Sequence, residues 1–261
     1  MVQVTVSSTP NGRADAICHT GQQAYFALPA EAQVPLSEAL QQFEEERHGE
    51  ARDQILYIQA QNNSLKLEFP MLLKDMDAEL PWATAAFGTQ PEAVNVWIGN
   101  HRSVTSVHRD HYENIYAVIS GTKRFRLLPP SDRYRLHMLD VPAARYQQTS
   151  EGWQLNPEVP RRTVTWCPIE LQTAAEARPG PAILEKFPQF FDASLPAPLE
   201  VDVHAGQVLY LPSMWYHMVE QQDDVSGRVI AVNYWYDMQF DCKYAYSQLI
   251  EDLCRICQSE A

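Results

Sequence analysis

The sequence predicts a mainly β protein with flanking helices, built as a sandwich or barrel. From residue 93 onward, short runs rich in β-branched and aromatic residues are separated by Gly and Pro turn signals. Strands this short and closely spaced are typical of antiparallel sandwiches and barrels rather than of parallel βαβ units. A chain of 261 residues that is 45% hydrophobic and 20% charged has the composition of one large globular domain.

Residues 1–92 are expected to form a mixed, partly helical flank that packs on the β core. Residues 1–34 lack clear periodicity, which indicates an irregular arm with at most one edge strand. Residues 35–48 predict a helix, because their apolar side chains recur at helical spacing. The remaining expectations for the flank are a strand at 54–59, an alternating segment at 64–67, and short helical or looped pieces at 69–75 and 82–87.

The β core is expected at residues 93–238. Its strand candidates are 94–98, 103–108, 115–119, 123–128, 199–203, 208–211, 216–220 and 229–236. The proline-rich residues 131–198 show little pattern, and we interpret them as a loop-like insertion with one helix at about 182–191. An amphipathic helix at 239–257 is expected to close the chain, and its apolar face either covers the core or meets a copy of itself in a homodimer.

Composition narrows the partners and the compartment. A net charge of −13 argues against non-specific binding to nucleic acid and fits a Lys/Arg-rich protein segment better. No apolar run approaches the roughly 20 residues that span a bilayer. The N-terminus lacks the pattern of a signal peptide, and five cysteines form no regular framework, so we expect a cytoplasmic protein, with the nucleus also open.

Residues that commonly bind metals occur at two places in the β half. His108 and Asp110 are two residues apart, and residues i and i+2 of a strand point to the same face. His217 lies in a later strand candidate and offers a third ligand. Their occurrence together in strands predicts a metal centre, although two imidazoles and one carboxylate suit Fe(II), Mn(II) and Zn(II) alike.

Lys123 indicates an anion site beside this centre. In its strand candidate it shares the more apolar face with Phe125, whereas Arg124 and Arg126 share the other face. An ammonium group inside a barrel is unfavourable unless a carboxylate of the protein or of a ligand pairs with it. The alternative is a Lys123 that points outward beside the two arginines.

Four further polar side chains are candidates for binding a small ligand. Thr105 precedes His108 by three residues and Asn114 follows it by six, and both can form hydrogen bonds. Tyr57 and Asn233 can do the same from other strands, although nothing in their local sequence singles them out.

Taken together, these motifs resemble the jumonji-C (JmjC) 2-oxoglutarate oxygenases. The resemblance rests on T-x-x-H-x-D from Thr105, on Asn and Lys at six and fifteen residues after His108, and on the segments LYLP-x-x-W-x-H and VNYWYD. It covers most of the chain from about residue 54 onward, and more loosely the helical N-terminal part, and it is strongest to the small protein-hydroxylase branch. It implies a double-stranded β-helix, which is a jelly-roll, cupin-like barrel with flanking helices.

The resemblance also implies roles for the candidate residues. His108, Asp110 and His217 would hold Fe(II). The residues implied to bind the co-substrate 2-oxoglutarate, with Lys123 on its distal carboxylate, are Tyr57, Thr105, Asn114, Lys123 and Asn233. The implied reaction uses O2 to hydroxylate a substrate C–H bond and releases succinate and CO2.

The branch implies a protein substrate with a target lysine, as in a lysyl hydroxylase that acts on GTP-binding proteins of the developmentally regulated class. A lysine side chain requires acidic or aromatic groups at the mouth of the pocket. The sequence offers Glu113, Asp237, Tyr112 and Trp235, each of which is equally explained as a packing or capping residue.

Other functions remain open at this point. A JmjC demethylase or an RNA-base hydroxylase would use the same site, although the negative charge counts against RNA. A non-catalytic binding protein of this family is also possible, but such proteins usually lose a ligand or the lysine, and here all are present. Cys254 and Cys257 form a C-x-x-C pair that would need two more ligands to bind zinc.

Overall fold

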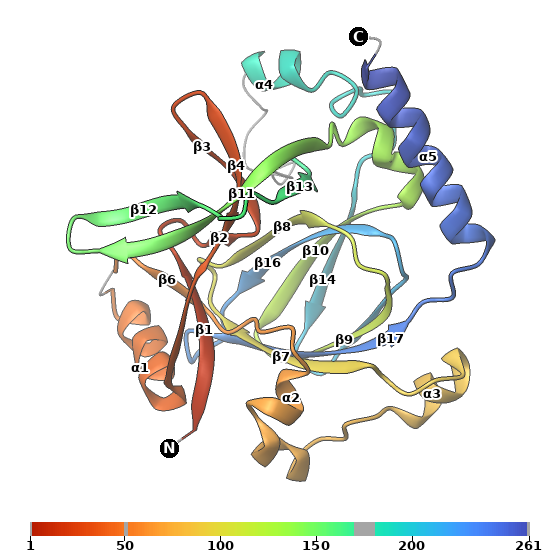
Figure 1. Cartoon of the computed structure of the whole chain (residues 1–261). Helices are drawn as coiled ribbons and strands as arrows, with labels where there is room; N and C mark the ends of the chain where they lie inside the picture. The colour runs from red at the N-terminus through yellow and green to blue at the C-terminus, as the bar shows by residue number, and fades with distance from the viewer. Residues whose placement is uncertain (1, 50–51, 170–180, 260–261) are drawn as a thin grey trace.

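The computed structural model, which describes residues 2–49, 52–169 and 181–259, confirms the predicted jelly-roll barrel (Figure 1). Its two sheets have the strand orders β14-β10-β16-β8-β2 and β15-β9-β17-β7, and they are antiparallel except for the short β2, which runs parallel to β8. The first contains β8 (Val104–His108), β10 (Thr122–Leu128), β14 (Leu199–His204) and β16 (Tyr216–Gln222). The second contains β7 (Ala93–Gly99), β9 (Tyr112–Ser120), β15 (Val208–Leu211) and β17 (Val229–Asp237). Successive strands mostly alternate between the sheets, as in a jelly roll.

Strand parity explains what fills the barrel and what covers it. In β17, Ala231 packs inside the barrel, whereas Val232 and Tyr234 pack in a second core outside it. The inner core joins side chains of both sheets: Trp97, Tyr116, Val118, Phe125, Leu127, Val203, Leu211, Val219 and Ala231. All eight barrel strands lie at the positions expected from the sequence, because the alternation of side chains there was strong.

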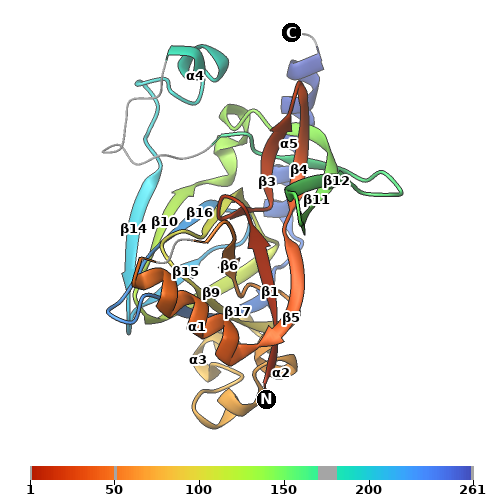
Figure 2. The same cartoon turned by 90° about the vertical axis from the view of Figure 1, so that its left-hand side faces the viewer.

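The N-terminal flank covers the outer face of β7 and β17. Its helices are α1 (Leu36–Arg47), α2 (Ser64–Leu67), the 3-10 helix Pro70–Lys74 and α3 (Pro81–Phe87). Beside α1 lies a three-stranded sheet of β5 (Ala30–Pro35), β1 (Gln3–Thr9) and β6 (Ile55–Tyr57), as Figure 2 shows. The alternating segment 64–67 is therefore helical, whereas the predicted helix at 35–48 and the strand at 54–59 are confirmed.

The expectation of an irregular arm at residues 1–34 is wrong. That segment forms five strands, namely β1, β2 (Arg13–Ala14), β3 (Ala16–Thr20), β4 (Gln23–Leu28) and β5. Several of them pair with distant parts of the chain: β1 with β6, β2 with β8, and β4 with β11. Local periodicity misses such strands because distant partners, rather than local pattern, stabilise them.

The expectation of a loop-like insertion is also wrong for its first half. Residues 139–166 form β11 (Leu139–Thr149), β12 (Gly152–Pro157) and β13 (Thr163–Trp166), and β11 joins β4 in a sheet. The proline-rich composition does not prevent these strands, since Pro142 lies within β11 and Pro157 ends β12. The 3-10 helix Pro130–Arg135 precedes them, and α4 (Pro181–Lys186) is shorter than the expected helix at 182–191. Residues 170–180 of the insertion lie outside the described residues.

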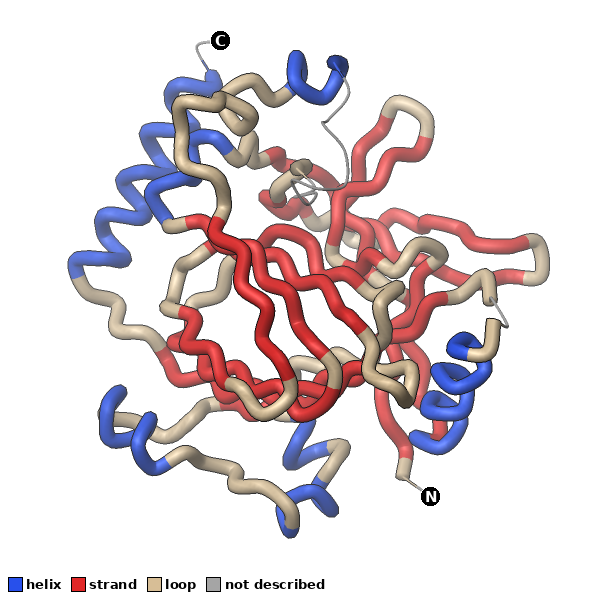
Figure 3. The backbone as a smooth tube through the Cα atoms, turned by 180° about the vertical axis from the view of Figure 1, so that it is seen from behind, coloured by secondary structure: helices blue, strands red, loops and turns tan. Residues whose placement is uncertain are grey.

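The closing helix α5 (Cys242–Ser259) runs along one side of the barrel (Figure 3) and begins three residues later than expected. Its apolar face is exposed rather than packed on the core, since Tyr246, Leu249, Leu253 and Ile256 are each more than half exposed. Within the described residues, no helix is both long and apolar enough to cross a membrane. The domain limits at 92 and 238 stay predictions.

Candidate active site

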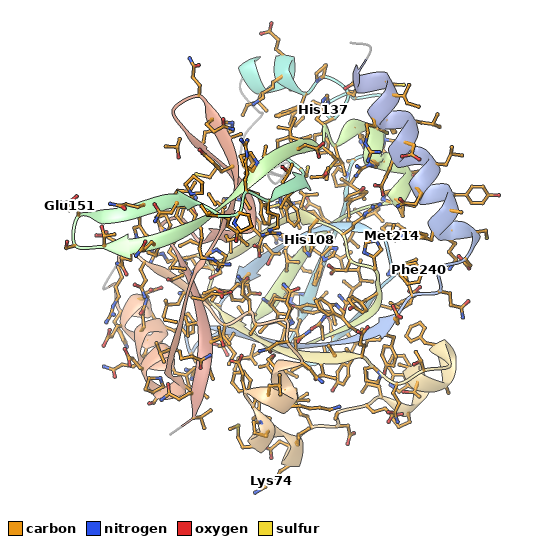
Figure 4. The ribbon with its side chains drawn as sticks, in the orientation of Figure 1. Lys74, His108, His137, Glu151, Met214 and Phe240 are labelled. Carbon is orange, nitrogen blue, oxygen red and sulfur yellow. The ribbon has the colours of Figure 1, made fainter. Side chains whose placement is uncertain are left out.

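The structure brings His108, Asp110 and His217 together at the centre of the molecule, where Figure 4 labels His108. One ligand atom from each residue lies within 4.8 Å of the other two. The Nε2 atoms of His108 and His217 are 3.7 and 3.6 Å from the same Asp110 oxygen, Oδ2. Asp110 lies just after the end of β8, where its carbonyl accepts a hydrogen bond from the Met214 N–H at 2.9 Å. Backbone pairing between two loops, rather than strand parity alone, therefore positions the carboxylate.

Each histidine is oriented by its backbone neighbours. The Nδ1 atom of His108 is 2.9 Å from the carbonyl of Ser106, and that of His217 is 3.1 Å from the carbonyl of Trp215. When Nδ1 donates its proton to a carbonyl, Nε2 keeps a free lone pair, and this is the usual arrangement of a metal-binding histidine. Burial, together with the nearby His108, lowers the pKa of His217 to about 4, so its ring is neutral at physiological pH.

A β-bulge explains why residues three apart share one face of β8. His217 pairs with His108, and two residues later Val219 pairs with Thr105, so the register shifts between them. Three residues of β8 therefore oppose two residues of β16, which reverses the side-chain alternation at the bulge. The bulge turns Thr105 and His108 toward the same side of the sheet. The bulge thus explains why the spacing between Thr105 and His108 is three residues rather than an even number.

Lys123 points into the barrel, as the alternation of β10 predicted. Its side chain is fully buried, and Nζ donates hydrogen bonds to Tyr57 Oη at 3.0 Å and to Gln221 Oε1 at 2.6 Å. Burial lowers the pKa of Lys123 to about 7. Its neighbour Arg124 points outward and pairs with Asp202 at 2.7 Å, so the outward alternative for Lys123 is wrong.

Two residues of this pocket were not predicted, namely Gln221 and Tyr116. Gln221 pairs with Lys123 in the β10–β16 register, and it lies four residues after His217 on the same strand. Tyr116 lies two residues after Asn114 in β9, and burial raises its pKa, with a further rise from the neighbouring Tyr57 hydroxyl. Both follow a predicted site residue at an even spacing, so strand parity carried the signal that could have identified them.

The two predicted asparagines meet inside the barrel. Asn233 Nδ2 donates to Asn114 Oδ1 at 3.2 Å, and Trp97 Nε1 donates to Asn233 Oδ1 at 2.8 Å. Both asparagines are buried. A chain of hydrogen bonds thus connects β7, β17 and β9 and fixes the amide orientation beside the candidate centre.

These residues fit an octahedral metal and a dicarboxylate. Ligand atoms that share a metal at bond lengths of about 2.1 Å lie roughly 3 to 3.5 Å apart, close to the separations seen here. Lys123, Tyr57 and Gln221 offer a buried cation with neutral hydrogen-bonding neighbours, which suits a single carboxylate. Among the described residues, the triad is the only cluster of this kind, and Cys254 and Cys257 belong to none.

Three of the four acidic and aromatic candidates for the pocket mouth have partners within the protein. Glu113 is already engaged, because it accepts hydrogen bonds from the Tyr210 hydroxyl at 2.6 Å and from Ser213 Oγ at 2.8 Å. Tyr112 and Trp235 stack in parallel with centroids 4.8 Å apart. Burial and nearby carboxylates, among them Asp237, raise the pKa of Tyr112.

A buried ion network ties the ligand segments to α5. Arg109, which separates two ligands in sequence, forms a salt bridge with Glu251 and donates to Ser247 Oγ at 3.0 Å. Arg133 lies 3.7 Å from the same Glu251 carboxylate and donates to Tyr216 Oη at 3.0 Å. Tyr216 directly precedes the third ligand, and so Glu251 connects both ligand-bearing segments to the helix.

Comparison with known proteins agrees with this geometry. The family model described as a cupin-like domain matches residues 1–242. The chain is 44% identical to "Lysine-specific demethylase JMJ32" of Arabidopsis thaliana, across 96% of this chain and 71% of that protein. It is 40% identical to "Bifunctional peptidase and (3S)-lysyl hydroxylase JMJD7" of Homo sapiens, across 97% and 73%. "JmjC domain-containing protein E" of Dictyostelium discoideum is 33% identical, across 96% and 74%.

The resemblance inferred from the motifs is thus confirmed. It also includes the residues that precede residue 54, so that it covers nearly the whole chain. The roles of the individual residues stay predictions. The family implies Fe(II) and 2-oxoglutarate, and the His–Asp–His cluster is able to hold a metal. The chain belongs to the cupin-like JmjC family of oxygenases.

Proposed function

We propose that this protein is an Fe(II)- and 2-oxoglutarate-dependent hydroxylase of a lysine side chain in a protein substrate. The observation that carries the proposal is the His–Asp–His cluster in one barrel with the buried Lys123. The relative named as a (3S)-lysyl hydroxylase supports the choice of lysine. As substrate we propose a GTP-binding protein of the developmentally regulated class, as the motif resemblance implies. The charge of −13 favours a basic segment of it.

The residues have distinct tasks in this proposal. His108, Asp110 and His217 hold the metal on one side and leave positions open on the other. Lys123 binds the distal carboxylate of 2-oxoglutarate, with Tyr57 and Gln221 orienting the ammonium group. We assign Thr105, Asn114 and Asn233 to the wall of the same pocket. When bound, iron and 2-oxoglutarate supply oxidation of a C–H bond by O2, with release of succinate and CO2.

Demethylation of a lysine is the second candidate, because a relative at 44% identity is named a lysine-specific demethylase. Both reactions use the same metal and co-substrate and differ only in the carbon that is oxidised. Base hydroxylation in RNA is disfavoured by the negative charge. A non-catalytic binding role is disfavoured because the sequence has a suitable residue at each of the three ligand positions and retains Lys123.

Mass spectrometry of a peptide separates these candidates. The protein with Fe(II), ascorbate, 2-oxoglutarate and air would be given lysine peptides from a GTP-binding protein of this class, unmethylated or methylated. Hydroxylation predicts a gain of one oxygen on unmethylated lysine. Loss of a methyl group from the methylated peptide, without oxygen gain on the other, would move the function to demethylation.

We further propose that the protein works in the cytoplasm or nucleus as a homodimer that pairs through α5. The support for the compartment is five cysteines that are all free. The support for the dimer is the exposed apolar face of α5, where Leu249, Leu253 and Ile256 line one side of a terminal helix.

A further inference from the structure

We propose that Asp15 and Trp166 form the subsite that receives the side-chain ammonium of the substrate lysine. The inference rests on the proposed function and adds the residues that recognise the charge. Neither residue belongs to the barrel, since Asp15 lies between β2 and β3, and Trp166 ends β13.

The fold places both residues at the edge of the barrel beside a ligand. Strand β2 runs parallel to β8 with Ala14 opposite Thr105, so the next residue, Asp15, lies close to Ser106. The Ser106 hydroxyl donates to the Asp15 carbonyl and accepts from Trp166 Nε1 at 3.0 Å. Asp15 and Trp166 therefore meet at one hydroxyl group, two residues before His108.

Trp166 extends this contact to the candidate metal centre. Its ring is parallel to that of His108, with 10° between the planes and centroids 6.1 Å apart. The side chains of His108 and Asp110 are 17% and 20% exposed, whereas that of His217 is only 6% exposed, so the centre opens on the side of the first two. An apolar ring at such an opening provides a surface along which the methylenes of a lysine can lie.

The Asp15 carboxylate is largely buried and is available to pair with a cation from a ligand. Within the described residues it makes no hydrogen bond or ion pair, although it is only partly exposed. Burial raises the pKa of Asp15, and the nearby His108 opposes that rise. The two arginines in its neighbourhood, Arg145 and Arg162, pair with Glu158 instead. A buried carboxylate without a partner is unfavourable unless a ligand supplies the opposite charge.

The length of a lysine side chain fits this placement. Carbon 3 of a lysyl residue is Cβ, and an extended chain puts the ammonium about 5 Å beyond it. When Cβ faces the metal, the charge therefore lies past the first ligands, on the side where Trp166 lies parallel to His108 and meets Asp15 at the Ser106 hydroxyl. The other acidic candidate, Asp237, is exposed, and water weakens its attraction for a cation.

Asp15→Asn is the variant that tests the subsite with least disturbance. Asp15 has a φ of +53°, which asparagine tolerates better than most residues do. The Ser106 hydrogen bond goes to the Asp15 backbone, so it survives the substitution. Asp237→Asn is the matched control, at an exposed carboxylate that ends β17.

The first measurement is binding of two probes, Nα-acetyl-lysine methylamide and its norleucine counterpart, followed by ligand-observed NMR. The protein would carry 2-oxoglutarate and Zn(II), which cannot support oxidation. We expect the wild type and Asp237→Asn to bind the lysine probe at least fivefold more tightly, and Asp15→Asn to bind both equally. Equal binding by the wild type, or a retained preference in Asp15→Asn, would overturn the subsite.

The kinetics of peptide oxidation provide an independent test of the subsite. With a lysine peptide that the wild type oxidises, Asp15→Asn should raise the KM for the peptide at least tenfold, with a much smaller change in kcat. An unchanged KM would contradict the assignment. Failure of the wild type to oxidise any lysine would overturn the proposed function alone, because the probe measurement tests the subsite without turnover.

Discussion

The buried Lys123 donates hydrogen bonds to a phenol and an amide, neither of which is charged. Its charged form is therefore poorly stabilised by the protein, and burial lowers its pKa accordingly. A ligand carboxylate that enters the pocket would restore the charge on Lys123 and gain a strong hydrogen bond in a medium of low dielectric constant.

Lys123→Ala should therefore weaken binding of 2-oxoglutarate by about 30-fold or more, since the loss of one partner in a buried charged pair removes about 2 kcal/mol or more. Isothermal titration calorimetry with Zn(II) in the site measures this directly. Arg124→Ala is the control, because that neighbouring cation points outward to Asp202. Equal affinity in Lys123→Ala would exclude Lys123 from the co-substrate site.

Binding of 2-oxoglutarate should also depend on pH. The free site has a Lys123 pKa of about 7, and the charged form is the one that attracts a carboxylate. Above pH 7 the Lys123 side chain of the empty site loses its proton. Binding of 2-oxoglutarate must therefore be accompanied by uptake of a proton by Lys123. We expect the affinity to fall about tenfold per pH unit between about pH 7.5 and 8.5. Titrations in buffers of different ionisation enthalpy would report the proton uptake, and a constant affinity would contradict this account.

At the residue scale, the metal-ligand candidates and Lys123 could be predicted from the sequence, but some of the residues beside them could not. His108, Asp110, His217 and Lys123 were predictable because charge and imidazole are rare inside a β barrel. Gln221 and Asp15 were not predicted, because an amide or a carboxylate is ordinary in sequence and gains meaning only from what lies beside it.

Helix α5 is the element that braces the ligand segments from outside the barrel. Glu251→Gln removes the charge that holds Arg109 and Arg133 together at its surface. We expect metal affinity to fall about tenfold, because distant supporting contacts commonly have effects of that size, and the melting temperature to fall by several degrees. Zn(II) titration and thermal unfolding measure the two effects.

The matched control for this helix is Asp252→Asn. Asp252 pairs with Arg255, but both side chains are more than 60% exposed, and such a pair contributes little. If Glu251→Gln behaves like Asp252→Asn in the metal titration, then Glu251 has no influence on the ligands.

The exposed face of α5 makes a separate prediction about assembly. Light scattering should give twice the monomer mass of 29.8 kDa, and Leu253→Arg should reduce it to one monomer, because a buried charge opposes pairing of apolar faces. Leu199→Arg, at an exposed leucine of β14, should leave the dimer intact. A wild-type protein of monomer mass would refute the proposed dimer.

At the element scale, strands of the barrel were predictable, whereas strands outside it were not. The segments β7 and β17 carry strong apolar patterns because both of their faces are covered. In contrast, the hairpin strands β3 and β12 have no fully buried residue. Their formation depends on the sheet shared by β4 and β11, which connects residues more than 100 positions apart.

In the whole molecule, the barrel and the N-terminal flank each contribute residues to the proposed site. The barrel holds the ligands and Lys123, and the N-terminal flank contributes Tyr57 from β6 as well as Asp15. In the proposed site, the early part of the chain thus supplies binding residues as well as covering the outer face of β7 and β17.

Fe(II)-dependent conversion of 2-oxoglutarate to succinate, measured for the wild type and for His108→Ala, decides whether the His–Asp–His cluster is the catalytic metal centre. We expect succinate from the wild type and none from His108→Ala, with metal affinity reduced at least about 100-fold. His48→Ala, an exposed histidine on the flank, should match the wild type. Absence of succinate from a wild type that binds iron and 2-oxoglutarate, or full activity with bound iron in His108→Ala, would contradict the account.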